Sequence, residues 1–405
     1  MTATMERGST FASLKVRNFR LFFTGQIISQ VGNWLTLIAQ TLLVYKITNS
    51  GVALGVLTAS QFLPNLLLGP WAGVIADRRD KRRLLLTVQS IAMLQSFVLA
   101  GVAFSDHPSV VAICIVASCG GVANAFDNPA RRSFVVEMVP VDQTQNAVSL
   151  NSALMTGSRV VGPALAGFLI HKVGFGWCFV VDGVSYFAVL LGLFLIRVTE
   201  LRPMEMLAKG KGQILSGVRY ARREPDLWVP LVMMAIVGTF TFNFNVVMPL
   251  LLKRTFHGGD TLFTNFYAVL SIGSVVGALV AARRTGIESR HMVWSSAAFG
   301  VAMAALALSP NAAVAFPIGF LVGVTSISFM TTSTTLIQLR SDPAMRGRVL
   351  SLQAMVFLGS TPIGGPIVGT ISQWLNPRVG VAVGAAAALI AAFYGWRSSV
   401  TGRRF

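Results

Sequence analysis

Charged residues are scarce in this sequence: Asp, Glu, Lys and Arg make up only 12% of 405 residues. An ordinary soluble domain contains about 25%, and a water-soluble fold of this length could not cover its surface with so little charge. Hydrophobic residues make up 54%. They occur in blocks of about 18–25 residues, the length that crosses a hydrocarbon core about 30 Å thick. The composition excludes a soluble globular protein and predicts a protein embedded in a lipid bilayer.

Cysteine and histidine are also rare. Three cysteines, Cys114, Cys119 and Cys178, lie in apolar segments without metal-ligand spacing or a disulfide pattern. The four histidines are scattered near span ends and in loops, so no metal site is expected. No nucleophile–base pair, HExxH, Walker or dinucleotide motif occurs in a convincing context. We therefore expect no enzyme, no cofactor and no ATP-driven pump.

The apolar blocks predict an all-α polytopic membrane protein with twelve spans. We place them near residues 21–45, 51–76, 84–104, 109–127, 144–171, 176–196, 227–252, 261–282, 292–308, 312–339, 347–374 and 379–396. Residues 1–20 are polar and basic and lack the apolar stretch of a signal peptide. The first span is therefore expected to act as an uncleaved anchor.

The basic residues divide unevenly between the two sides of this layout. Of 33 Lys and Arg, 27 fall in the N-terminal tail, the even-numbered loops and the C-terminal tail. The other side carries Lys46, Lys172, Lys253, Arg254 and Arg378. The positive-inside rule then predicts an inner-membrane protein with both termini in the cytoplasm. It also explains the net charge of +18 without a nucleic-acid partner.

An internal repeat appears at an offset of 202 residues, close to half the chain, where residues 149–167 align with residues 351–369. Ser149, Leu150, Gly157, Ser158, Gly162 and Gly167 recur as Ser351, Leu352, Gly359, Ser360, Gly364 and Gly369. The repeat predicts two parallel six-helix bundles, residues 1–197 and 227–405, joined by a cytoplasmic connector at 198–226. Parallel repeats place a substrate path between the halves. Residues 214–223 could form an amphipathic helix on the anionic leaflet, or the connector could be a solvated tether.

The loop after the second span contains a candidate conformational latch. Gly73 permits close packing, and Asp77 follows one turn later on the same helix face. Its carboxylate could cap a neighbouring helix or pair with a cation, while Arg78, Lys81 and Arg82 hold the loop at the cytoplasmic surface. Such a bond would form in one conformation and break in another. The alternative is a plain positively charged loop.

Residues 73–83 resemble the signature of the major facilitator superfamily between its second and third helices. Asp80 stands where the general pattern prefers Gly, as in the branch of the enterobactin exporter and the macrolide efflux pumps. The resemblance extends to residues 127–131 and 346–348, and residues 157–167 are similar to the GxxxGP motif of drug–proton antiporters. It implies a twelve-helix secondary transporter and an exporter branch, but names no substrate.

The fifth span carries that last motif in Gly157, Arg159, Gly162, Pro163 and Gly167. Small residues let neighbouring backbones approach, and the proline bends the helix, so the motif could seal one side of the path or only pack. A charge at mid-span costs about 2.5–3.5 kcal/mol or more, so Arg159 needs an interior partner.

Two acidic residues could pair with Arg159, directly or through a polar bridge. Asp182 lies within the sixth span, and Asp127 lies at the end of the fourth. Asp182, then Asp127, are the candidate proton carriers, with Arg159 beside them, because carboxylates inside spans often serve proton relays. A packing pair that never titrates is the alternative.

Polar residues could line the substrate path. Gln26, Gln30, Asn33 and Gln40 share one face of the first span beside Trp34, and Asn243 and Asn245 stand among phenylalanines in the seventh. Amides and aromatic rings around a midplane cavity suit an amphiphilic organic solute. Hydrogen bonding between helices is the competing role for each of them.

Together these features predict a monomeric, proton-coupled exporter of small amphiphilic molecules such as drugs or siderophore-like compounds. The bilayer, protons and a small-molecule substrate are its expected partners. Transport of another solute, such as lysophospholipid or a metabolite, is the first alternative. A membrane-embedded enzyme or a non-transporting receptor would need convergent catalytic groups or a folded extramembrane domain, and the sequence shows neither.

Overall fold

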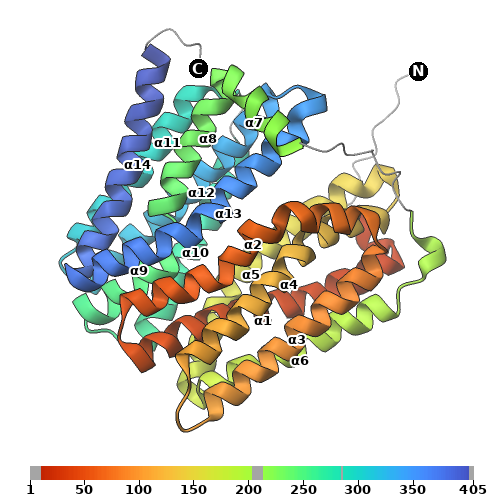
Figure 1. Ribbon diagram of the computed structural model, residues 1–405, viewed down its shortest axis with the longest axis horizontal. Helices are drawn as coiled ribbons and strands as arrows, with labels where there is room; N and C mark the ends of the chain where they lie inside the picture. Colours follow the sequence, from red (N-terminus) through yellow and green to blue (C-terminus); the bar gives the residue numbers. More distant parts are fainter. Residues whose placement is uncertain (1–10, 203–212, 284–285, 401–405) are drawn as a thin grey trace.

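The computed structural model describes residues 11–202, 213–283 and 286–400, and the regular structure in these ranges is helical (Figure 1). The long helices are α1 (Arg17–Thr48), α2 (Gly51–Arg78), α3 (Lys81–Phe104), α4 (Val110–Glu137), α5 (Thr144–Val173), α6 (Phe175–Phe194), α7 (Gln213–Arg223), α8 (Pro225–Phe240), α9 (Phe244–Leu250), α10 (Asp260–Ala282), α11 (Ser289–Leu308), α12 (Ala312–Arg340), α13 (Pro343–Trp374) and α14 (Pro377–Val400). Short turns are η1 (Ala12–Lys15), η2 (Val141–Gln143), η3 (Val198–Glu200) and the π-helical η4 (Leu251–Thr255). Twelve helical segments are long and apolar enough to cross a membrane, which confirms the predicted fold class.

Tight turns separate consecutive spans, and polar caps start several of the helices. Ser50 accepts a hydrogen bond from the Ala53 N–H at the start of α2, and Asp80 accepts one from the Arg83 N–H at the start of α3. These caps satisfy N–H groups that have no partner within the helix. Gly174 alone separates α5 from α6, with a φ of +91° that favours glycine. The short turns make the spans that they join antiparallel.

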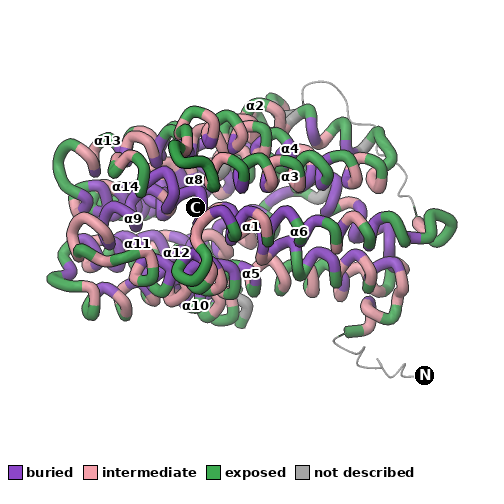
Figure 2. Tube along the Cα trace, turned by 90° about the horizontal axis from the view of Figure 1, so that it is seen from below, coloured by how far each residue is buried: buried purple, intermediate pink, exposed green. Residues whose placement is uncertain are grey.

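The spans form two groups of six. In the first, α1 packs on α6 and α5, α2 packs on α4, and α3 lies between α4 and α6. In the second, α10 packs on α12, α11 on α14, and α8 on α13 and α14. Figure 2 shows burial along the inward faces of these helices. Large apolar residues such as Phe187, Trp294 and Phe393 stay exposed, a pattern that suits a lipid surround and not water.

The two groups meet along two seams. In the first, between α2 and α13, the Gly51 N–H donates to Oε1 of Gln373 at 2.7 Å. A Cβ added at Gly55 would stand only 2.6 Å from Cα of Pro366. The second seam joins α5 to α10. Both seams involve the helix ends near the α1–α2 and α5–α6 turns, here called the opposite face.

The halves separate toward the other face, where α1 begins and α14 ends, here called the terminal face. Among the described residues, no heavy atom lies within 4 Å of a Cβ added at Gly73 in α2 or Gly157 in α5. In Figure 1 the two groups meet at the lower left and diverge toward the upper right. The structure is therefore closed at the opposite face and open toward the terminal face.

The seventh span is broken, which the sequence did not predict. It consists of α8, α9 and η4, with a non-helical turn at Phe242 and Asn243. Thr241 donates to the Gly384 carbonyl at 2.8 Å, and Asn243 donates to the Thr239 carbonyl at 2.6 Å. These side chains supply polar contacts where the helical ladder is interrupted, as a non-helical segment at membrane depth requires.

The fourth span is longer than expected. The prediction ended it at residue 127 and counted Arg131 among the loop cations. Helix α4 instead continues through Pro129 to Glu137, and Arg131 is buried. The added turns stay helical because they bury Phe134 and Val135 against neighbouring helices of the same half. Asp127 therefore lies well inside the helix, which corrects its predicted place at a span end.

The predicted connector helix exists as α7, and its inner face packs on the second half. Ser216 accepts a hydrogen bond from Arg348 at 3.0 Å, and the Tyr220 hydroxyl donates to Asp342 at 3.2 Å. Ala221 is buried with Val349 in a small apolar cluster. Helix α7 is thus docked on the second half and is not a solvated tether.

Candidate functional site

Arg159 lies near the middle of α5, at the point where the halves begin to separate. Its guanidinium stands 5.9 Å from the ring centre of Trp34 in α1, and Tyr267 of α10 lies within electrostatic reach. The rings of Trp34 and Tyr267 are 6.3 Å apart, so the group spans both halves. Arg159 is exposed, and within the described part of the chain it forms no ion pair.

The glycines around Arg159 have different neighbours. Gly162 lies directly against Trp34, and Gly167 lies against Thr264 of α10, so a side chain at either would collide with its neighbour. Gly157, on the terminal side, has free space. Pro163 is buried inside the helix. The terminal end of this motif is therefore unpacked and its other end is packed against neighbouring helices, and Arg159 lies between these two parts.

Asp182 is enclosed within the first half, where its side chain meets α1 and α3. Thr36 and Ser96 donate to its Oδ2 at 2.6 and 2.7 Å. Its Oδ1 lies close to Gly32 and has no hydrogen-bond partner among the described residues. The residue is 1% exposed. Hydroxyl groups, and not Arg159, therefore surround this carboxylate.

Asp127 has a cation of its own. It forms an ion pair with Arg131, one turn along α4, and Gln89 of α3 donates to its Oδ1 at 2.6 Å. A cavity of about 60 Å³ adjoins the pair and is also lined by Asn33 and Tyr186. Nε of Arg131 and Oε1 of Gln89 find no partner among the described residues. A polar cavity of this size has room for ordered water.

Each half contains one asparagine–tyrosine hydrogen bond. The Tyr186 hydroxyl donates to Oδ1 of Asn33 at 2.7 Å, and the Tyr267 hydroxyl donates to Oδ1 of Asn245 at 2.8 Å. Tyr186 also lies within electrostatic reach of both Asp182 and Arg131. The first pair thus connects the two buried carboxylate sites of the first half.

The other predicted path residues are buried within their own halves. Gln30 donates to Gln26 at 3.2 Å, and Gln61 of α2 donates to Gln40 at 2.7 Å. Asn243 bonds the broken helix, as described above. These contacts are interhelical or within one helix. Trp34 and Asn245 therefore lie near the α5–α10 seam, whereas Asn33 and the other amides lie inside their own halves.

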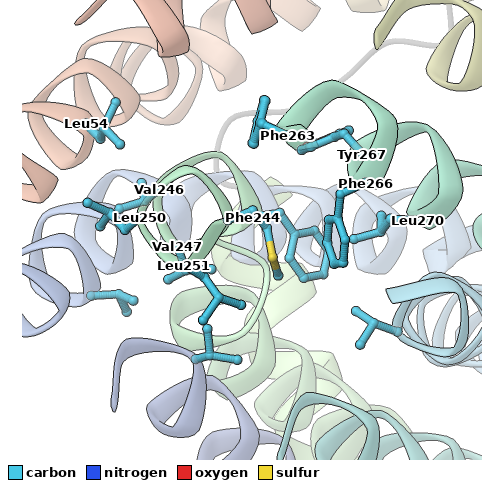
Figure 3. Close-up of a cluster of buried hydrophobic side chains, with 14 of the residues drawn as sticks. Leu54, Phe244, Val246, Val247, Leu250, Leu251, Phe263, Phe266, Tyr267 and Leu270 are labelled. Atoms are coloured by element: carbon cyan, nitrogen blue, oxygen red, sulfur yellow. The ribbon is translucent and has the colours of Figure 1, made fainter. Parts of the chain in front are cut away.

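Aromatic and aliphatic side chains fill the closed side of the path. Figure 3 shows Phe244 of α9 beside Phe266 of α10, with Phe263 and Tyr267 on the same helix. The set is fully or almost fully buried. It forms an apolar plug between the Arg159 group and the opposite face.

The basic loop of the candidate latch binds within the first half. Lys81 pairs with Glu137 at the end of α4 at 2.6 Å, and Arg82 donates to the Leu193 and Phe194 carbonyls at the end of α6. Arg78 is exposed. The side chain of Asp77 lies outside the described residues. Lys81 and Arg82 therefore brace three helices of one half.

Comparison with known proteins identifies this architecture. Residues 8–403 match the model of a family described as "Transmembrane secretion effector". The chain belongs to this family, within the major facilitator superfamily. Members of this superfamily are membrane transporters, so the chain is a transporter and not an enzyme.

Two sequence relatives and one solved structure illustrate these similarities. It is 26% identical to the staphyloferrin A transporter of Staphylococcus aureus, covering 85% of this chain and 87% of the relative. It is 23% identical to macrolide efflux protein A of Streptococcus pyogenes, covering 86% and 89%. A solved structure of a bacterial homologue of the human lysosomal transporter Spinster, inward-facing and unoccupied, shares its fold with a TM-score of 0.75 at 15% identity, covering 95% and 96%.

Sequence reasoning missed several residues that the fold brings together. Arg131 follows Asp127 by four positions, the spacing of an ion pair on one helix face, so that pair could have been found. Glu137 and Gln89 carried no such signal, because each meets a partner on another helix. Tyr186 and Tyr267 were likewise invisible without the fold.

Proposed function

We propose that the chain is a proton-coupled exporter of small amphiphilic molecules and that Asp182 carries the proton. The observation that supports this most directly is that Asp182 is buried and accepts hydrogen bonds from two hydroxyl groups, while no described residue forms an ion pair with it. A carboxylate without a counter-ion is unstable in an apolar medium when charged and far less so when protonated. Binding and release of a proton would therefore be strongly linked to the packing of α1, α3 and α6.

The cavity beside Asp127 offers a route for that proton. It is lined by the Asp127–Arg131 pair and by Tyr186, which lies between this pair and Asp182. We propose that water in the cavity connects the terminal side of the first half to Asp182. Asp127 would then be a second, relaying carboxylate, because its charge is already balanced by Arg131.

The direction of transport follows from the open face and from charge. We propose that the terminal face, which collects most of the Lys and Arg, is cytoplasmic and that the protein lies in the inner membrane. In that orientation the structure is open to the cytoplasm, where an exporter loads its substrate. The names of relatives, one a macrolide efflux protein, favour export.

Release would require the opposite face to open and the terminal face to close. The proposed latch residues Gly73 and Asp77 lie near the terminal end of α2, away from both seams. They would engage only when the halves meet there. Both seams lie within one chain, so we propose a monomer, with boundaries between halves and connector at residues 197 and 227.

The test is uptake of labelled erythromycin and of a panel of anionic and cationic amphiphilic dyes into inverted membrane vesicles. We expect uptake driven by respiration, abolished by a protonophore, and reduced roughly tenfold or more in Asp182→Asn. Asp182→Glu, which keeps a titratable group, should retain coupling, and Asp142→Asn, at an exposed turn, should behave as wild type. Full coupled uptake by Asp182→Asn would exclude this residue as the carrier. Uptake insensitive to the protonophore would contradict proton coupling.

A further inference from the structure

Near the middle of the spans, the charge that faces the space between the two halves is positive. In residues 11–202, 213–283 and 286–400, Arg159 is the cation that reaches this space near the middle of a span. The carboxylates at similar depth, Asp127 and Asp182, are buried inside the first half and engaged by other partners. An organic molecule entering from the terminal face would therefore meet one positive charge and no exposed negative one.

Trp34 covers one face of the Arg159 guanidinium and leaves other donors free. A guanidinium carries five N–H donors in a planar fork that matches carboxylate or phosphate oxygens. Among the described residues these donors have no hydrogen-bond or ion-pair partner. An exposed mid-span arginine without a protein partner is a functional site by default, and the missing partner here has the chemistry of an anion.

Aromatic surfaces flank the same group from both halves. Trp34 comes from α1 and Tyr267 from α10, with their rings 6.3 Å apart. Tyr267 is held by its hydrogen bond to Asn245, and Gly162 lets Trp34 lie close to α5. Flat rings beside a cation suit a ligand whose anionic group adjoins an aromatic or broad apolar part.

We propose that Arg159, Trp34 and Tyr267 form an organic-anion site, and that the exported molecule carries an anionic group next to an apolar ring system. This specifies the substrate class of the proposed exporter and rests on that function. Because the site draws on both halves, a bound anion contacts each of them at the point where they separate. Binding of the anion would therefore affect the movement of the halves that opens one face and closes the other.

The test is equilibrium binding of two dyes to the purified full-length protein in detergent, followed by fluorescence anisotropy. Fluorescein and rhodamine 123 share a xanthene ring system but carry opposite charges. We expect wild type to bind fluorescein at least tenfold more tightly than rhodamine 123. Arg159→Gln should weaken fluorescein binding roughly tenfold or more and leave rhodamine 123 unchanged or tighter. Arg159→Lys, which keeps the charge but not the planar fork, should fall between the two.

The matched control is Arg222→Gln, since Arg222 also stacks on a tryptophan, Trp228, at 5.6 Å, but in the connector region. It should bind both dyes as wild type does. Equal or weaker binding of fluorescein than of rhodamine 123 by wild type would overturn the proposal, and this comparison needs no variant to fold. Unchanged fluorescein binding by a folded Arg159→Gln protein would assign Arg159 to packing and overturn it equally.

The binding assay contains no gradient, so its failure is separate from failure of the proposed function. Fluorescein-selective binding together with protonophore-insensitive transport would uphold the site and refute the coupling. Coupled transport of erythromycin, together with binding that does not distinguish the two dyes, would uphold the proton coupling and refute the anion site.

Discussion

At the scale of single residues, the first half holds two buried carboxylates in contrasting environments. Asp127 is balanced by Arg131, whereas the hydrogen bonds that Asp182 receives from described side chains come from hydroxyl groups. A buried ion pair adds little net stability over apolar packing, yet removing one partner leaves an uncompensated charge. The two sites should therefore respond differently to mutation, Asp127 in stability and Asp182 in coupling.

Replacing Arg131 by Met should destabilise the protein by about 3–5 kcal/mol, because Asp127 would stay buried without its cation. The double variant Asp127→Asn/Arg131→Met should recover much of that loss. Thermal unfolding in detergent measures both effects. The exposed neighbour Arg132 offers the control, and Arg132→Met should unfold as wild type does. Equal stability of Arg131→Met and Arg132→Met would show that the buried pair contributes nothing.

At the scale of elements, the sequence repeat acquires a physical meaning. Gly167 of α5 lies against Thr264 of α10, and its repeat equivalent, Gly369 of α13, lies against Gly51 of α2. Both repeated glycines thus stand at seams between the halves. Small residues recur there because they let helix backbones approach closely, which the opposite face needs in order to close.

A cross-link across the α2–α13 seam should stop transport. A Cβ added at Gly365 would lie 3.3 Å from Cβ of Thr58, close to the 3.5–4.5 Å typical of disulfides. In a background with Cys114, Cys119 and Cys178 replaced by Ser, oxidation of Thr58→Cys/Gly365→Cys should abolish vesicle uptake, and reduction should restore it. The two single variants should be insensitive to oxidant. Full uptake by the cross-linked protein would mean that this seam does not open during transport.

At the scale of the whole molecule, charge and packing bear on different questions. The excess of Lys and Arg on one side predicts which face is cytoplasmic, and the closed seams identify the face that is sealed in this conformation. Together they predict that this conformation is open toward the cytoplasm, as the proposed exporter requires for loading.

Green fluorescent protein fused after residue 405 should therefore fluoresce in cells, while alkaline phosphatase fused there should be inactive. The reverse should hold for fusions at Gly258, in the turn between η4 and α10 on the opposite face, because few basic residues lie on that side. Fluorescence and phosphatase activity of intact cells report the two results. Active phosphatase at residue 405 would invert the proposed orientation and, with it, the direction of loading.

The sequence alone determined that the protein is a twelve-span membrane transporter built from two repeats. That information is local, because span length, charge bias and short motifs can be read without knowing which helices touch. The same local reading placed Asp127 at a span end, since Pro129 and two arginines resemble a loop, and it missed the break at Asn243.

Only the tertiary structure decided the partners of the buried polar residues. Thr36 and Asp182 are 146 positions apart and still form a hydrogen bond, and Arg159 meets Trp34 and Tyr267 in place of either carboxylate. Such contacts depend on how each helix is rotated and offset against its neighbours. In this chain apolar residues face both the lipid and the protein interior. The hydrophobic periodicity of a span therefore does not show how the helix is rotated, and packing between the helices determines that rotation.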